Sequence, residues 1–184
     1  EAGVFIVAGE SGEQRAIVRS ADGVTWTPAS MRPSPCGSYT LGMAYGGGAV
    51  VMVSGNGYVC RSLDGGDTWM QILISQRLTS PPVWTGSEFY VYEGGTLHRS
   101  ADGAQWSNFQ VVPEGLSIGP VARSPEGTFV AANDGWMVWY EAQQFYRSDD
   151  GIMWEILPDG AFVGSHPIYF MAHGRVKPGA GCAG

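Results

Sequence analysis

Four variants of one short pattern recur along this chain of 184 residues. Each variant reads Arg-Ser-x-Asp-Gly and ends on a Trp, and together they occupy residues 19–26, 61–69, 99–106 and 147–154. The pattern returns roughly every 40 residues, and a fixed turn at such a period indicates a repeated supersecondary unit. The sequence therefore predicts one domain assembled from four modules.

Short runs rich in β-branched and aromatic residues surround each pattern. In the second module, runs at 49–54 and 58–62 precede the turn, a Trp-led run at 69–74 follows it, and a further run lies at 40–45. Such runs, separated by Gly-rich or polar turns, are typical of strands. The 28 glycines and the 15% of charged residues suit short strands joined by tight turns. Each module is therefore expected to form four short strands.

The first module lacks its leading strand, and the C-terminal part of the chain offers a spare one at Ile168–Ala172. Residues 40–46 and 168–174 share a Met-Ala ending followed by an aromatic ring and Gly. Radially repeated four-stranded sheets leave only short edges, and closure removes the seam. We therefore predict an all-β propeller of four blades, closed by the C-terminal strand joining the N-terminal blade. The predicted domain spans 1–176, the tail is 177–184, and the blades are 1–30 with 168–172, 39–74, 82–111 and 119–157.

The four patterns resemble the Asp-box, or BNR repeat, which reads Ser-x-Asp-x-Gly-x-Thr-Trp. Residues 62–69 fit all eight positions, and the other three copies are one residue shorter. The resemblance implies a β-propeller of the superfamily that includes sialidases, sortilin-type receptor domains, photosystem assembly factors and lectins. It also implies that the box is a structural turn at the blade edge, away from any active centre. The structural box residues are Ser20, Asp22, Trp26, Ser62, Asp64, Trp69, Ser100, Asp102, Trp106, Ser148, Asp150 and Trp154.

Propellers of this family usually have more than four blades. Two interpretations follow: the chain closes alone as a small propeller, or it forms part of a larger assembly. The strand count favours closure, because it leaves no strand over.

Candidate ligand-binding residues gather in the loops expected opposite the box turns. The fourth module carries an insertion with aromatic, acidic and amide groups, and a second polar loop spans 9–15. Aromatic faces stack on sugars and carboxylates bind hydroxyls, so a glycan or small-ligand surface is one interpretation. The other is that the insertion only extends a hairpin and that 9–15 is a solvated turn. The candidates are Asn133, Asp134, Trp136, Trp139, Tyr140, Glu141, Glu10, Glu13 and Arg15.

Several classes of function are disfavoured by the sequence. The net charge of −7 argues against a nucleic-acid partner, and no apolar run is long enough to span a membrane. Three histidines at distant positions predict no metal site, and motifs for cofactors or nucleophilic catalysis are absent. The arginines that precede the box serines lie in separate blades, so they do not form a carboxylate clamp. No cofactor and no catalytic residue is predicted.

Three cysteines are too few for a disulfide framework. One pair among Cys36, Cys60 and Cys182 can be oxidised, which leaves one thiol. Cys60 alternates as a buried strand residue, and Cys182 in the tail is a possible attachment point. A strand-like run follows Glu1 almost at once, as after removal of a secretion signal, so the expected location is secreted, periplasmic or at the cell surface.

Three functional hypotheses follow. The first is a secreted or envelope binding module, lectin-like, that uses the loops opposite the box turns. The second is a structural or assembly protein that binds another protein. The third, less favoured, is a glycan-acting hydrolase or lyase with a carboxylate pair such as Glu13 and Glu141.

Overall fold

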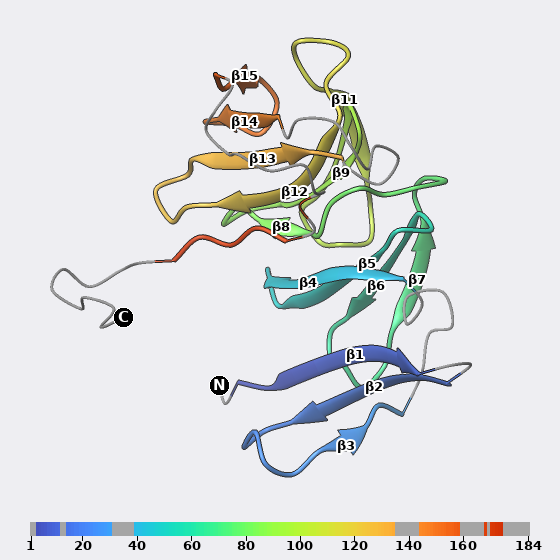
Figure 1. Ribbon diagram of the computed structural model, residues 1–184. Coiled ribbons are helices and arrows are strands. Elements are labelled where there is room, and N and C mark those ends of the chain that lie inside the picture. Colours follow the sequence, from blue (N-terminus) through green and yellow to red (C-terminus); the bar gives the residue numbers. More distant parts are fainter. Residues whose placement is uncertain are drawn as a thin grey trace, which may run out of the picture.

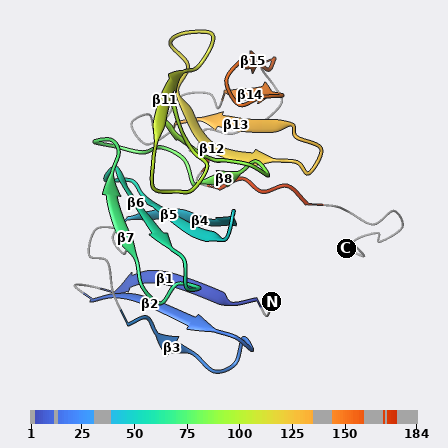
Figure 2. The same ribbon diagram turned by 180° about the vertical axis from the view of Figure 1, so that it is seen from behind.

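The computed structural model describes residues 3–11, 14–30, 39–134, 144–158, 168 and 170–174. These residues form fifteen strands in four antiparallel sheets, which follow one another along an arc (Figure 1; Figure 2 shows the reverse side). No helix in this part of the chain is long and apolar enough to cross a membrane. The prediction of an all-β fold built from four repeated sheets is confirmed.

Each sheet is an up-and-down meander in chain order. The first sheet has three strands and the other three sheets have four. The strands of the first two sheets are β1 (Phe5–Ser11), β2 (Gln14–Ser20), β3 (Thr27–Pro28), β4 (Thr40–Gly46), β5 (Ala49–Ser54), β6 (Tyr58–Ser62) and β7 (Met70–Leu73). Those of the last two are β8 (Val83–Trp84), β9 (Phe89–Glu93), β10 (Thr96–Ser100), β11 (Ser107–Gln110), β12 (Ile118–Arg123), β13 (Phe129–Asn133), β14 (Phe145–Ser148) and β15 (Glu155–Ile156).

The core consists of three apolar clusters, one between each pair of consecutive sheets. Side chains alternate between the two faces of a strand, so one face of β5 packs on the first sheet and the other on the third. Met52 belongs to the cluster that holds Ile17 of the first sheet. Val51 and Val53 belong to the cluster that holds Phe89 of the third sheet. Each sheet therefore presents one face to the sheet before it and the other face to the sheet after it.

The box turns are held together by the same hydrogen bonds in every sheet. The serine hydroxyl accepts the backbone N–H of a box glycine at 2.8 Å in all four copies and donates to the box aspartate. That carboxylate in turn accepts two backbone N–H groups from the residues that follow. A short polar side chain that replaces backbone partners stabilises a tight turn. In this geometry each serine and aspartate holds its own turn together.

The box tryptophans pack against the preceding sheet, with one exception. Trp69 and Trp154 are buried, and Trp106 is partly buried in the cluster between the second and third sheets. Each of these three indoles donates its N–H to a carbonyl in its own box turn, as from Trp69 to Gly66 at 2.9 Å. Trp26 is 41% exposed. Trp26 does not pack in this way, because no described sheet precedes the first one.

The inner strands of neighbouring sheets approach each other closely at one glycine. A Cβ atom at Gly46, the last residue of β4, would lie 2.0 Å from the indole of Trp84 on β8. Only a residue without a side chain lets the Trp84 ring lie over this strand end. This contact helps to set how the third sheet sits on the second.

The predicted closing strand does not form among the described residues. Ile168 and residues 170–174 lie outside any strand, and β1 pairs only with β2. Figure 1 shows the segment at 168–174, in red, well apart from β1. The apolar clusters between the described sheets lie only between sequential neighbours, and none of them joins the first sheet to the last. The predicted ring is therefore an open arc here.

Candidate functional site

The loops opposite the box turns come together around the connection between the second and third sheets. This connection runs from Ile74 to Pro82, and its backbone follows the ends of strands in two sheets. Leu78 donates its N–H to the carbonyl of Gly55 at 3.2 Å, and Thr79 donates to that of Tyr92 at 2.8 Å. These hairpin loops and the connection between the sheets lie together on one side, which is here called the loop face.

Thr79 ties the connection to two further sheets. Its hydroxyl donates to the carbonyl oxygen of Ile118 at 2.6 Å and accepts the N–H of Gly94 at 2.9 Å. Ile118 begins β12 of the fourth sheet, and Gly94 follows β9 of the third. One threonine from the connection after the second sheet thus bridges the two sheets that follow it.

Two of the predicted ligand-binding residues stand at this junction. Asp134 directly follows β13, donates its N–H to the carbonyl of Ser117 at 2.9 Å, and pairs through its carboxylate with the guanidinium of Arg77. The Asn133 side-chain oxygen accepts the N–H of Gln144 at 3.1 Å. The two ends of the insertion are therefore joined at its base, and that base is held to the second sheet's connection.

The other candidates belong to the insertion and to the segment at 9–15. Trp136, Trp139, Tyr140, Glu141 and Glu13 lie outside the described residues. The backbones of Glu10 and Arg15 face each other as a register pair of β1 and β2. The predicted loop at 9–15 is therefore mostly hairpin strand, because the pairing of the two strands continues to Ser11 and Gln14.

Arg77 is a candidate binding residue that the sequence analysis did not predict. The Arg77 side chain is 43% exposed, while the side chain of its partner Asp134 is 12% exposed. An exposed arginine that pairs with one carboxylate has further N–H donors that can reach a ligand. No local motif marks Arg77, and its partner is 57 residues away.

The arginines before the box serines have a structural role that the sequence did not reveal. Arg19 donates to the carbonyl oxygen of Asp64 at 3.0 Å, and Arg61 donates to that of Asp102 at 2.6 Å. Each of these two side chains thus binds the box turn of the next sheet. Arg99 instead lies 4.0 Å from the ring centre of Phe109 in its own sheet. The expectation that these arginines do not converge on one centre agrees with these contacts.

The box carboxylates are committed to their turns. Backbone N–H groups of Thr25 and Val24 hold the pKa of Asp22 well below its usual range. Burial raises the pKa of Asp64, but hydrogen bonds from Thr68 and Ser62 outweigh it and lower the value to about 2. Hydrogen bonds to the charged form favour ionisation, so these groups stay anionic near neutral pH. They are poor candidates for a general acid.

Neither a metal site nor a free cysteine appears in the part of the chain that the structure describes. No group of three or more His, Cys, Asp or Glu side chains there could hold a metal ion. His98 is buried, and its Nε2 lies 3.2 Å from a carboxylate oxygen of Glu93. Cys60 is disulfide-bonded, and Cys36 and Cys182 lie outside the described residues.

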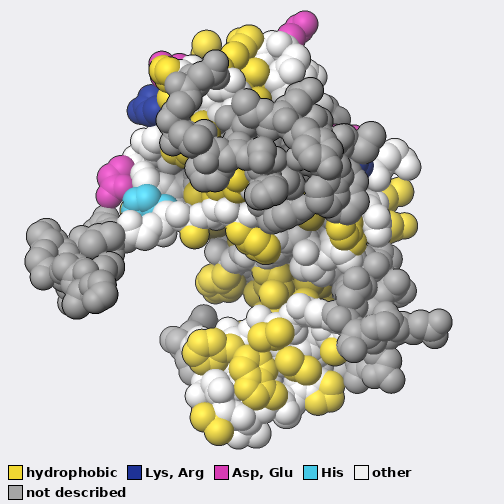
Figure 3. Space-filling view, viewed as in Figure 1, with side chains coloured by type: hydrophobic (Ala, Val, Ile, Leu, Met, Phe, Trp, Pro, Cys, Tyr) yellow, Lys and Arg dark blue, Asp and Glu magenta, His cyan; other side chains and the backbone are white. Residues whose placement is uncertain are grey.

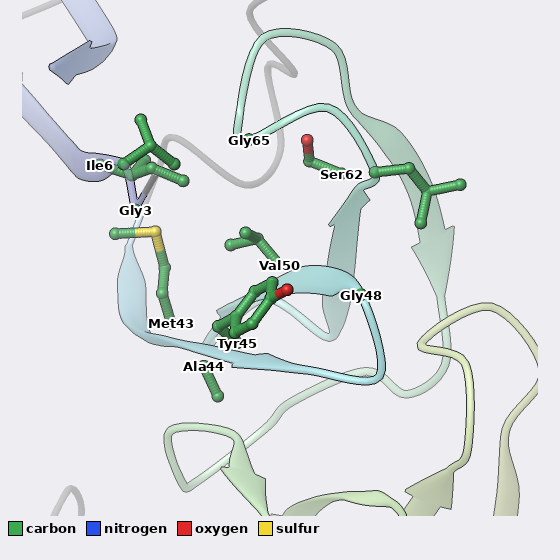
Figure 4. Close-up of a pocket in the computed structure, with 11 residues that line it drawn as sticks. Gly3, Ile6, Met43, Ala44, Tyr45, Gly48, Val50, Ser62 and Gly65 are labelled. Carbon is green, nitrogen blue, oxygen red and sulfur yellow. The ribbon is translucent and has the colours of Figure 1, made fainter. Parts of the chain in front are cut away.

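A cavity of about 830 Å³ lies between the first two sheets, beside the second box turn. Figure 4 shows Ile6, Met43, Tyr45 and Val50 around it, with Ser62 at its rim. Most of its lining side chains are apolar, and none of them is charged. It lies next to a box turn and so is separate from the loop face.

Comparison with solved structures shows the class of fold. The chain is similar to YCF48 bound to D1 peptide, with a TM-score of 0.60 and 18% identity over 85% of this chain and 52% of that one. It is also similar to virginiamycin B lyase from Staphylococcus aureus, with a TM-score of 0.59 and 16% identity over 91% of this chain and 59% of that one. A third similar structure is the GH74 enzyme from Niastella koreensis, with a TM-score of 0.58 and 16% identity over 84% of this chain and 27% of that one. The fold is thus that of β-propeller proteins. No protein-family description matches the chain, and no curated protein matches it.

The extent of these matches bears on the predicted ring. The chain spans about half to three fifths of the length of the YCF48 and lyase structures. Its four sheets therefore superimpose on only part of those longer chains.

Proposed function

We propose that this chain is a binding module whose ligand contacts the loop face where the second, third and fourth sheets meet. The observation that carries the proposal is the pairing of Arg77 with Asp134. It puts an exposed arginine side chain next to the residue from which the insertion after β13 begins. An arginine has five N–H donors and suits hydroxyl or carboxylate groups of a ligand.

A glycan is the first candidate ligand. The insertion contains Trp136, Trp139 and Tyr140 next to Glu141. Aromatic faces stack on the C–H surfaces of sugars, while amide, carboxylate and guanidinium groups bind hydroxyls. The proposed role is therefore lectin-like, and the proposed location is outside the cytosol. The disulfide at Cys60 supports that location, because disulfides persist in oxidising compartments.

A peptide is the second candidate ligand. One similar structure is described as YCF48 bound to D1 peptide, which supports a protein-binding or assembly role on this fold. A hydrolase or lyase role finds less support. The box carboxylates are occupied within their turns, and the carboxylate pair Glu13 and Glu141 rests on sequence alone. Folds of this kind host many activities, so the function has to be argued from the residues of the site and not from the fold.

The test is a binding screen of the intact chain on a glycan array and on a peptide library. We expect Arg77→Met and the Trp136→Ala/Trp139→Ala double variant each to weaken binding to any glycan hit by at least about tenfold, roughly the effect of one charge-assisted hydrogen bond or one stacked ring. Arg147→Met is the matched control, because Arg147 pairs with Asp149 in a box turn on the opposite side.

Three results separate the candidates. Glycan hits that depend on Arg77 and not on Arg147 support the lectin-like role. Peptide hits with the same dependence and no glycan hits replace it by the second candidate. Hits that are insensitive to Arg77 would overturn the proposed site.

A further inference from the structure

The outward face of the first sheet is apolar and exposed, although the same face is buried in every other sheet. Phe5 and Val7 are 58% and 50% exposed, and Figure 3 shows hydrophobic side chains gathered over this sheet. The strand register makes Phe89 and Val91 of β9 their equivalents, since Phe5 and Phe89 both pair with a box serine. Both equivalents are 0% exposed. An exposed apolar patch of this kind marks an interaction surface.

The inner edge of the first sheet is also without a partner. In the other sheets an inner strand, β4, β8 or β12, pairs with the strand equivalent to β1. Among the described residues no strand pairs with this edge of β1. The cavity between the first two sheets lies beside this edge and is lined by Ile6 of β1 and by Met43 and Tyr45 of β4 (Figure 4). The missing element is thus one inner strand.

Tyr45 indicates which strand would fit there. Its position on β4 is equivalent to that of Trp84 on β8, because Tyr45 pairs with Val50 and Trp84 pairs with Phe89. Trp84 covers Gly46 at the end of the preceding inner strand. Tyr45 is 66% exposed, so the strand that it would cover is absent. That strand should end on a residue without a side chain.

The segment at 168–174 meets this requirement. It reads Ile-Tyr-Phe-Met-Ala-His-Gly against Thr-Leu-Gly-Met-Ala-Tyr-Gly in β4, so Gly174 takes the place of Gly46. Its described residues, 168 and 170–174, lie outside any strand, Phe170 is 75% exposed, and a Cβ at Gly174 would meet nothing within 4 Å. The chain therefore carries both a vacant strand position and an unpaired segment with the matching pattern, and the two lie apart in the structure (Figure 1).

We infer that the occupant is a second copy of this chain. We place two arcs in one ring, related by a twofold axis that passes through the centre of the ring. In this arrangement the last sheet and residues 168–174 of each copy lie against the first sheet of the other copy. The outer positions of the last sheet fit this role, because Val130 is half-buried while its equivalent Val51 is 0% exposed. One chain spans about half the length of the YCF48 structure, so two copies supply the length of such a ring. A closed ring also removes both exposed edges.

The test is the mass of the intact chain in solution, measured by light scattering across a dilution series. We expect about twice the 19.6 kDa of one chain. Phe5→Lys should weaken the dimer at least about tenfold, because the lysine ammonium would lie in an apolar interface. Ala172→Pro should do the same by removing a backbone donor from the added strand. Leu73→Lys is the control, since Leu73 is similarly exposed but lies on the outer strand β7.

Two other outcomes of the mass measurement would overturn the inference. A monomer at all concentrations overturns the inference, whether the segment at 168–174 closes its own ring or stays unpaired. A dimer that Phe5→Lys and Leu73→Lys weaken equally, or not at all, uses another surface and also overturns it. Circular dichroism of each variant, matched to the parent chain, shows that the fold is retained.

Discussion

Arg61 donates a hydrogen bond from its Nε to the carbonyl oxygen of Asp102 at 2.6 Å, from the third strand of one sheet to the box turn of the next. Arg19 makes the equivalent contact with Asp64 one sheet earlier. The Arg-Ser pair that opens the pattern thus has two roles. Its serine organises the local turn, and at these two positions its arginine attaches the sheet to its neighbour.

Replacing Arg61 should therefore cost more stability than replacing Arg147. We expect Arg61→Met to lower the free energy of unfolding by about 1–2 kcal/mol, in the range for a hydrogen bond to a charged group. Arg147→Met should lie within about 0.5 kcal/mol of the parent chain, because its exposed pair lies within one turn. Denaturant unfolding measures both. Equal losses in the two variants would contradict the role assigned to Arg61.

The buried tryptophan of the fourth sheet should be a major source of stability. Trp154 is 5% exposed, and its ring centre lies 5.8 Å from that of Tyr92 and 6.3 Å from that of Phe129. Trp154→Ala should cost about 3–5 kcal/mol, as expected for a large aromatic removed from a core. The neighbouring Met153 is 64% exposed, and Met153→Ala should change stability by less than about 0.5 kcal/mol. Thermal unfolding and denaturant unfolding should both show the larger loss of stability for Trp154→Ala. A loss of stability in Trp154→Ala no larger than that in Met153→Ala would refute the packing described.

Acid should weaken the fold through the box carboxylates. The folded pKa of Asp64 lies below its ordinary value of 3.8, at about 2. A depressed carboxyl pKa contributes stability that is present above the unfolded pKa and is lost as pH falls through the folded pKa. The contribution of Asp64 should therefore be complete above about pH 5 and be lost between about pH 4 and pH 2. Because Asp64 is exposed at the surface, we expect a modest effect for this single group.

The measurement is the urea midpoint as a function of pH for the parent chain and for Asp64→Asn. The asparagine retains a side-chain oxygen but has no charge to titrate, so the fall in midpoint below pH 4 should be smaller in the variant. A variant curve parallel to that of the parent chain would show that Asp64 does not contribute.

Much of the fold could be predicted from the sequence because its signals are local. Ser62 and Asp64 bond to backbone groups within four residues, so their turn follows from the pattern itself. The runs before and after each turn are rich in β-branched and aromatic residues, and the hairpins follow from these runs and the turns between them. The candidate site was predictable only in part. Asn133 and Asp134 were found from an insertion in the repeat, whereas Arg77 carries no local mark.

The sequence by itself determined the four modules, the box turns and the strands. The tertiary structure decided that the sheets form an open arc, that Trp26 is exposed while Trp69 is buried, and that Arg77 meets Asp134. The physical reason is the separation along the chain over which the interactions act. Turn chemistry acts within a few residues, but the rotation from one sheet to the next is set by side chains such as Trp84 over Gly46, which lie far apart in the chain.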